Sequence, residues 1–368
     1  MAGAAAAAAA PSTSAASGSG GAQNAFWQVT NLYSRKNKLG QISGLQLTTG
    51  QLDGGAAIDA VGFLRGPRLE LRSSGGAGTP NADNPADTFK YVGLLDTDGT
   101  PIINPLIKGW TWLQVQRHFR PWMKDPTYAW DYAQSANPSM TMFLQPEVRQ
   151  QLGVLENTDT RQQYSWSHSF DTFANIGATT APTVSLTAYV DVWAQPDVTD
   201  LEGIPNERIP PGVNLQTKVR QQTFTLNNAS ADNIFLSSLT GNALRGGLLI
   251  VRDSNNNRQD YLSNPINWML DDRTLSIVDV DMYFQWAQDF YACFGGPRSP
   301  RPTGVYPFPR FYNVGALLGQ GWLYTSNATA VSWESSTSAT AANLPGTVTL
   351  VQEEVYNVGQ IDTSLLDL

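Results

Sequence analysis

Two similar stretches, about 180 residues apart, constrain the fold of this chain more than any other feature. In the first, residues 60–72, apolar residues alternate with charged ones, the two-residue period of a strand with one buried face. The second, residues 244–252, is apolar on both parities near its end, which is typical of a strand covered on both sides. A turn-rich segment follows each, at residues 73–80 and 253–257. The repetition predicts two similar β domains in tandem.

The length and composition fit this prediction. A chain of 368 residues has room for two domains of about 150 to 180 residues, each able to bury a full core. Only 15% of the residues are charged, while 32 glycines and 22 prolines supply many turns, a composition typical of β proteins. About eight short strands can be counted in each half. We therefore expect an all-β fold of two tandem eight-stranded jelly rolls (a double jelly roll) with short helices in loops.

Composition also predicts the domain boundaries. Residues 1–24 are mostly Ala, Ser, Gly and Thr, which bury too little apolar surface to offset their ordering entropy, so a flexible N-terminal arm is expected. An arm that becomes ordered against a partner subunit is the alternative. The first jelly roll is expected over residues 25–195 and the second over 216–368. Residues 196–215, which are rich in proline, are expected to form the linker between them.

Each predicted domain closes with a long strand. Residues 184–194 alternate strictly between apolar and polar side chains, and residues 347–356 lie about 163 positions later. In the second of these strands the apolar parity changes between Leu350 and Val351. This change predicts a β-bulge at that point.

Two further segments occupy corresponding places in the two halves. Residues 107–123 satisfy both the helical spacing of apolar residues and the alternation of a strand, so both assignments stay open. About 174 residues later, Asp279 or Asp281 can cap a helix that runs to about Cys293. The duplication therefore extends beyond a single strand.

The residues needed for metal or nucleophilic chemistry are scarce. His118 and His168 are the only histidines, too few for the metal centres of a duplicated cupin, and Cys293 alone forms neither an intrachain disulfide nor a cysteine metal site. Ser167 and Ser169 flank His168, but neighbouring strand residues point to opposite faces. We therefore expect no catalytic residues, no metal site and no cofactor.

The sequence also predicts no catalytic role for the carboxylates. Glycoside hydrolysis requires two carboxylates across a cleft, whereas Asp271–Asp272 and Glu353–Glu354 are adjacent pairs, expected in a turn and in a strand. Residues 96–99, Asp-Thr-Asp-Gly, lack the further ligands of an EF-hand and predict a plain turn. A carbohydrate-binding or carbohydrate-active jelly roll remains the alternative function, because 11 Trp and 13 Tyr could stack on sugars. Core packing and subunit contacts also account for these aromatic residues.

Three short segments carry a resemblance to a known family. Residues 61–69, Val-Gly-Phe-Leu-Arg-Gly-Pro-Arg-Leu, are similar to an early strand of the first barrel of a set of double jelly-roll proteins. Residues 304–306 and 313–315 are similar to the late part of the second barrel. On these residues the chain resembles the double jelly-roll major capsid proteins of tailless, internal-membrane bacteriophages of the tectivirus type. The likeness covers most of residues 25–358 as architecture.

The resemblance implies a viral structural protein without enzymatic activity. Homotrimers would form pseudo-hexagonal tiles of an icosahedral shell around an internal membrane. Their partners would be neighbouring trimers, penton, minor capsid or membrane proteins, and the lipid itself. The protein would reside in the virion, after assembly in the host cytoplasm. The lack of a very long insertion favours a prokaryotic virus.

The charge distribution refines the expected partners. No Lys or Arg precedes Arg35, so the arm is not expected to be attracted electrostatically to anionic lipid. The net charge of −8 and the scattered basic residues argue against direct nucleic-acid binding. Loops rich in aromatic residues, Pro and Arg, at residues 120–122 and 297–302, are expected to supply rigid contact surface between tiles.

Overall fold

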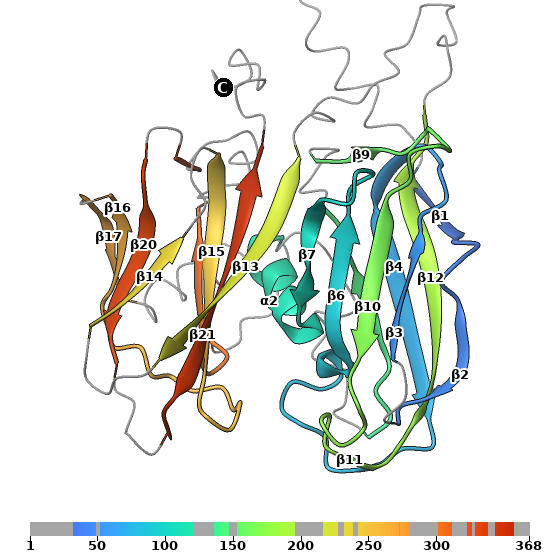
Figure 1. The fold of residues 1–368 in the computed structure, drawn as a ribbon, viewed down its shortest axis with the longest axis horizontal. Coiled ribbons are helices and arrows are strands. Elements are labelled where there is room, and N and C mark those ends of the chain that lie inside the picture. The colour runs from blue at the N-terminus through green and yellow to red at the C-terminus, as the bar shows by residue number, and fades with distance from the viewer. Residues whose placement is uncertain are drawn as a thin grey trace, which may run out of the picture.

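The computed structural model describes twelve stretches of the chain, residues 32–48, 52–120, 136–146, 153–195, 216–226, 232–237, 242–271, 273–279, 301–310, 322–325, 328–337 and 343–356. Two β-sandwiches lie side by side with one helix between them (Figure 1). The first barrel comprises strands β1 to β12 and the second barrel strands β13 to β21. The predicted arm (1–24) and linker (196–215) lie outside the described residues.

The first barrel consists of two facing sheets. One sheet has the strand order β1–β12–β4–β8, with bounds Leu32–Lys36, Thr183–Trp193, Phe63–Ser74 and Met140–Phe143. Two short strands pair at its margins, β2 (Ile42–Gln46) with β12 and β9 (Leu155–Glu156) with β4. The facing sheet has the order β7–β6–β10–β3, with bounds Pro101–Ile107, Phe89–Leu95, Ser165–Phe170 and Asp53–Ala57. The short strands β5 (Ala77–Gly78) and β11 (Ala178–Thr180) form a separate pair.

The second barrel repeats this arrangement. Its first sheet has the order β13–β21–β15–β18, with bounds Thr217–Leu226, Gly346–Val355, Ala243–Arg252 and Val305–Pro309, and β19 (Leu323–Tyr324) pairs with β15. Its second sheet has the order β14–β20–β16–β17, with bounds Asp232–Ser237, Val331–Ser336, Ile266–Leu270 and Arg273–Val278. Each barrel thus has eight principal strands in the same connectivity, which confirms the predicted pair of eight-stranded jelly rolls.

The two repeated stretches and the two closing strands are partners in this fold. In the first barrel β4 pairs with β12 along its length, and in the second β15 pairs with β21 in the same antiparallel sense. Strands β4 and β15 also carry a register shift at the same place in the repeat. The extra residues are Arg65 and Arg245, each the arginine of a Leu-Arg-Gly sequence. The sequence repeat therefore marks a repeated bulge as well as a repeated strand.

The predicted bulge between Leu350 and Val351 is wrong. Strand β21 pairs with β13 in continuous register from Thr217 to Leu226, and the shift lies on β15 instead. Both faces of β21 are buried, so apolar residues occur on both parities without any break in the ladder. The change of parity reflects this double burial.

Alternating side chains build the cores as predicted. On β12 the buried apolar residues are Val184, Leu186, Ala188, Val190 and Val192. On β10 the aromatic face of Trp166, His168 and Phe170 is buried, while the serines between them lie on the other face. The core of the second barrel contains a stacked pair of tryptophans, Trp268 and Trp333, with ring centroids 5.4 Å apart.

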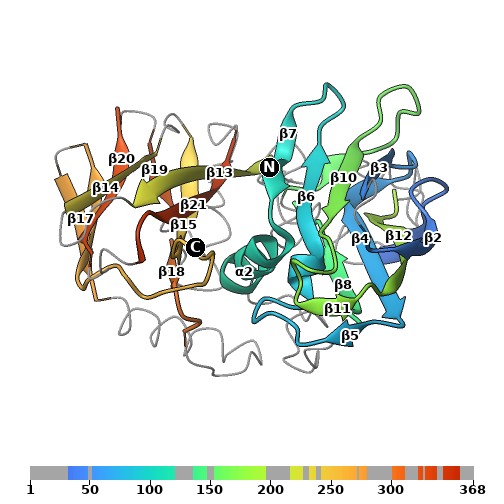
Figure 2. The same cartoon turned by 60° about the horizontal axis from the view of Figure 1, so that its bottom comes forward.

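Residues 109–119 of the undecided segment form a helix, α2 (Gly109–Phe119). It follows β7 and lies between the two barrels (Figures 1 and 2). The other described helix is the single 3₁₀ turn η1 (Ala86–Thr88). The second predicted helix, from Asp279 or Asp281 to Cys293, lies almost entirely outside the described residues, in the corresponding connection between β17 and β18.

The predicted turns are confirmed. Residues 96–99 connect β6 to β7, with hydrogen bonds from the amides of Asp96 to Thr100 O and of Gly99 to Asp96 O. Asp271 has a positive φ of 51° between β16 and β17, and its carboxylate accepts hydrogen bonds from the amides of Thr329 and Ala330.

Candidate functional site: the junction between the two barrels

A parallel contact between two edge strands joins the barrels into one continuous sheet. Strand β7 ends a sheet of the first barrel and β13 ends a sheet of the second, and they meet through the pair Ile103 and Val219. The joined sheet runs β18–β15–β21–β13–β7–β6–β10–β3. Each edge covers the unpaired backbone groups of the other at this point.

Helix α2 fills the space beside this contact. Its apolar residues belong to a core cluster that also includes Leu248, Ile250, Val305 and Val351 from the outer face of the second barrel. Gly246 allows the close approach of the helix, because a Cβ at this position would lie 2.7 Å from the Phe119 ring. The first barrel's core therefore continues into the face of the second barrel.

A buried ion triad crosses the junction. The carboxylate of Glu353, on β21, pairs with Arg245 on β15 and with Arg120, which directly follows α2. All three side chains are completely buried, and Arg245 also donates to Phe119 O at 3.3 Å. Burial and the neighbouring Arg120 lower the pKa of Arg245, while Glu353 opposes this shift. One carboxylate thus bridges two guanidinium groups at a point that water does not reach.

This triad corrects one expectation. Arg120 was expected to offer contact surface to other tiles, but it lies inside the molecule. Arg301, in the other predicted contact loop, pairs with Asp260 at 2.7 Å and stacks over the Tyr306 ring at 4.7 Å. Both arginines make contacts within their own chain.

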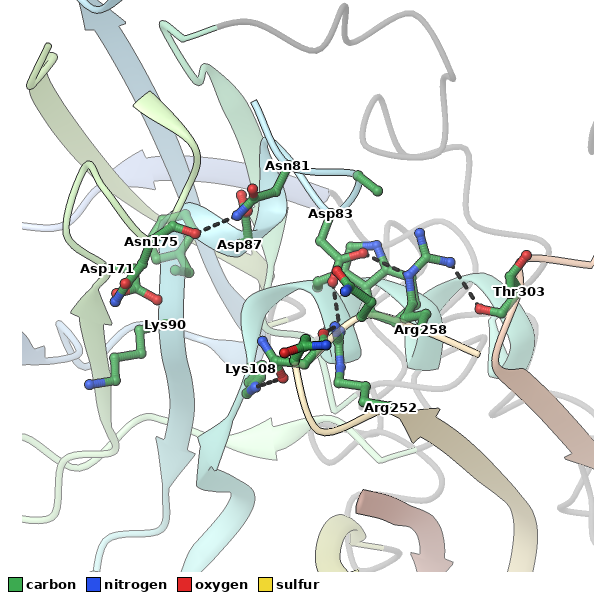
Figure 3. Close-up of a pocket in the computed structure, with 16 residues that line it drawn as sticks. Asn81, Asp83, Asp87, Lys90, Lys108, Asp171, Asn175, Arg252, Arg258 and Thr303 are labelled. Carbon is green, nitrogen blue, oxygen red and sulfur yellow. Dashed lines mark hydrogen bonds and ion pairs between the residues drawn. The ribbon is translucent and has the colours of Figure 1, made fainter. Parts of the chain in front are cut away.

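A second group of ion pairs joins the two barrels near the N-terminal end of α2. Asp83 lies in the loop before η1, and its two carboxylate oxygens bind Arg252 at 2.6 Å and Arg258 at 2.8 Å (Figure 3). Trp110 of α2 lies under both guanidinium groups, with centroid distances of 5.4 Å to Arg252 and 4.5 Å to Arg258. Arg258 also donates to Thr303 O. The bridge fixes the loop after β15 against the first barrel.

A polar pocket of about 680 Å³ opens beside this bridge (Figure 3). Besides the bridge residues, its charged lining includes Asp87, Lys90, Lys108 and Asp171. The carboxylate of Asp87 lies close to Asn81, whose side chain favours its charged form. Burial, Asp83 and Asp171 together raise the pKa of Asp87 to about 7. The group is therefore partly neutral near neutral pH.

The histidines are not arranged for catalysis in this fold. His168 stacks on Trp166 at 5.2 Å and contacts Phe170 at 4.7 Å, within the first core. Burial lowers the pKa of His168 to about 4 and lowers that of His118 well below its ordinary value. Ser167 and Ser169 point away from His168, as predicted. Across the described part of the chain, no group of three or more His, Cys, Asp or Glu side chains could hold a metal ion.

The aromatic residues that motivated the carbohydrate alternative are mostly core residues. Six of the seven tryptophans that the structure describes are buried, and Trp193 has Arg65 over its ring at 5.5 Å. Trp110, which lines the polar pocket, has its ring covered by arginines. The described tryptophans therefore present no open stacking platform.

Among the described residues, no helix has the length and apolarity required to cross a membrane.

About nine tenths of the chain is similar in fold to capsid proteins of known structure. The STIV MCP is 12% identical with a TM-score of 0.61, and the match covers 92% of this chain and 100% of that chain. A chain of the PBCV-1 virus capsid is 10% identical with a TM-score of 0.53, over 89% and 94% of the two chains. The major capsid protein P2 from bacteriophage PM2 is 11% identical with a TM-score of 0.50, over 89% and 98%.

At these identities the likeness is one of fold. It confirms the predicted double jelly roll and the predicted resemblance to double jelly-roll capsid proteins as architecture. No family model and no curated protein matches the sequence.

Proposed function

We propose that this chain is the major capsid protein of a virus and acts as a structural tile without enzymatic activity. The observation that carries the proposal is the match over almost the full length of both chains to the STIV MCP and to the major capsid protein of bacteriophage PM2. The junction supports the same conclusion. A joined sheet, a shared core and two ion bridges make the two barrels one rigid block, as a tile requires.

The finer features of the proposal follow the resemblance. The tile is a homotrimer with a pseudo-hexagonal outline, in an icosahedral shell around an internal membrane. Its partners are neighbouring trimers and penton, minor capsid or membrane proteins, and it resides in the virion after assembly in the host cytoplasm. We retain residues 1–24 as an arm, 25–195 and 216–368 as the two jelly rolls, and 196–215 as their linker.

Light scattering of the purified full-length protein tests the proposal. We expect three times the monomer mass, and electron micrographs with hexagonal outlines. A stable monomer at micromolar concentration would contradict the tile. Thermal unfolding with and without a panel of oligosaccharides tests the carbohydrate alternative, and we expect no stabilisation by any of them.

A further inference from the structure

The polar pocket beside the ion pairs of Asp83 has the size of a ligand-binding site. Its volume of about 680 Å³ lies within the range of about 300–1,000 Å³ that is typical of ligand pockets (Figure 3). Its walls come from both barrels. Lys90 on β6 and Lys108 before α2 belong to the first barrel, and residues 255–258 after β15 belong to the second. A molecule bound there would therefore contact both barrels.

Positive charge prevails in this pocket. Among the residues described around it, four are cationic and three are acidic, although the chain as a whole has a net charge of −8. The carboxylate of Asp83 is shared by Arg252 and Arg258, so this group of ion pairs is itself positive. Asp87 is partly neutral near neutral pH, because burial, Asp83 and Asp171 raise its pKa to about 7. The pocket therefore attracts an anion.

Lys108 lies where it can meet such an anion. Its ammonium group donates to Asn256 Oδ1 at 3.4 Å, a long hydrogen bond to an uncharged side chain. Burial and the neighbouring Arg252 lower the pKa of Lys108, while Asp83 and Asp171 oppose this shift. A carboxylate in the pocket would favour the charged form of Lys108 and raise its pKa again.

The uncharged lining suits a peptide. Side-chain amides both donate and accept hydrogen bonds, as peptide groups do. Three loops supply asparagines to the described lining, and these are Asn81, Asn175, Asn255, Asn256 and Asn257. A closely spaced row of phosphates would approach Asp83 and Asp171 in the same pocket and be repelled by them. A peptide with a single carboxylate avoids most of this repulsion.

We propose that the pocket binds an acidic segment of a partner protein, with a side-chain carboxylate beside Lys108 and the neutral carboxyl group of Asp87 donating a hydrogen bond to it. The asparagines bind the peptide groups on either side of this carboxylate. All the lining residues belong to one chain, so the inference goes beyond the proposed tile and does not depend on the trimer.

The proposal predicts the sign of a pH dependence. Burial, Asp83 and Asp171 raise the pKa of Asp87, and the side chain of Asn81 lowers it. The cationic groups around the same pocket are Lys90, Lys108, Arg252 and Arg258. A bound carboxylate brings a further negative charge, which raises the pKa of Asp87, so binding takes up a proton. The affinity should therefore be highest below about pH 7 and fall as the pH rises above it.

Isothermal titration calorimetry of the full-length protein tests the proposal with short synthetic peptides. The probe is a peptide blocked at both ends, with one central Asp flanked by Gly and Ser, at low ionic strength. Two matched peptides carry Asn or Lys in place of the Asp. We expect the Asp peptide to bind at least about tenfold more tightly than either of them, because only its carboxylate meets the lysine.

Variants of the pocket locate the binding site. Lys108→Gln, and Lys90→Gln at an exposed residue of β6, should each weaken binding of the Asp peptide, by about tenfold for Lys108→Gln. Lys38→Gln removes an exposed lysine in the loop after β1, outside the pocket, and should leave the affinity unchanged. Asp87→Asn keeps a hydrogen-bond donor that does not titrate. It should therefore bind equally at about pH 6 and pH 8, whereas wild type should lose several-fold in affinity between them.

The remaining outcomes would overturn the proposal. Equal affinity for the Asp and Asn peptides, or no binding of either, would show that the pocket does not recognise a carboxylate. A preference for the Lys peptide, with an affinity that rises with pH, would make it a cation site. Binding that is the same in Lys108→Gln and Lys38→Gln would place the peptide elsewhere. A wild-type monomer that binds the Asp peptide as expected would contradict the tile and support this site.

Discussion

The carboxylate of Glu353 on β21 pairs with the guanidinium of Arg120 at the end of helix α2, and both side chains are completely excluded from solvent. The pair joins the second barrel to the first. Arg245, the bulge residue of β15, holds the other oxygen of the same carboxylate. The bulge therefore directs a repeated arginine into the junction, whereas its equivalent, Arg65, stacks half-buried on Trp193 in the first barrel.

Removing the central charge should be costly. Glu353→Gln would leave two buried guanidinium groups without a compensating anion, and we expect a loss of about 3–5 kcal/mol in the free energy of unfolding. Chemical denaturation measures this loss. Glu156→Gln, at an exposed glutamate of β9, is the control and should change stability by less than about 0.5 kcal/mol. A Glu353→Gln variant as stable as this control would show that the triad does not stabilise the junction.

The strand repeat and the core faces could be predicted from the sequence, because alternation is a local property. The repeat predicted β4 and β15 and the alternation predicted the long closing strand β12, while the period of two predicted the buried face of β10; that β4 pairs with β12 and β15 with β21 came from the structure. Helix α2 could not be distinguished from a strand for a physical reason. The two barrels bury it on almost all sides, so it lacks the polar face that identifies a surface helix.

The ion triad at the junction could not be predicted from the sequence. Its residues are far apart in the chain, and their neighbours in sequence do not indicate burial. Arg120 precedes a proline and suggests an exposed loop, while Glu353 lies among polar residues at the end of a strand. Arg245 and Glu353 are 108 positions apart, and no local pattern indicates that they meet. The Leu-Arg-Gly repeat was the available signal, since a repeated bulge often redirects a side chain.

Strand β15 should not tolerate a methyl group at Gly247. A Cβ there would lie 2.6 Å from Cζ2 of Trp333, which stacks on Trp268 in the second core. We expect Gly247→Ala to cost about 1–3 kcal/mol through overpacking, as measured by denaturant midpoints. Trp333→Phe should relieve part of this cost in the double variant, so the two changes should be less than additive. Strict additivity would show that the contact is not the cause.

The neutral form of Asp87 should stabilise the junction. The pKa of its carboxyl group is raised from 3.8 to about 7 by burial, Asp83 and Asp171, so the folded chain holds a proton that the unfolded chain releases. Its contribution to stability is complete below about pH 4 and is lost as the pH rises through about 7. In Asp87→Asn this dependence should disappear. The melting temperature of the variant minus that of wild type should therefore increase as the pH rises from 4 to 7. Asp159→Asn, in an exposed loop, is the control and should follow wild type.

The burial of His168 should make stability depend on pH in the opposite direction. Burial lowers the pKa of His168 from 6.5 to about 4, so below pH 6.5 the unfolded chain binds a proton that the folded chain does not. Stability from this group is complete above pH 6.5 and is lost as the pH falls toward 4, by up to about 3 kcal/mol. His168→Gln should remove this loss, whatever its constant cost at neutral pH. Melting temperatures measured from pH 4 to pH 7 give the slope.

The opposite signs of Asp87 and His168 make the two slopes separable. In wild type the Asp87 slope offsets only part of the combined slope of the buried histidines His168 and His118 between pH 4 and pH 6.5, so a shallow loss of stability on acidification is expected there. Asp87→Asn should steepen the loss of stability on acidification, and His168→Gln should make this loss smaller than in wild type, because Asp87 then opposes His118 alone. His118, whose pKa burial also lowers, should leave a residual histidine slope in both variants. If His168→Gln keeps the wild-type slope between pH 4 and pH 6.5, His168 is not held neutral by the core.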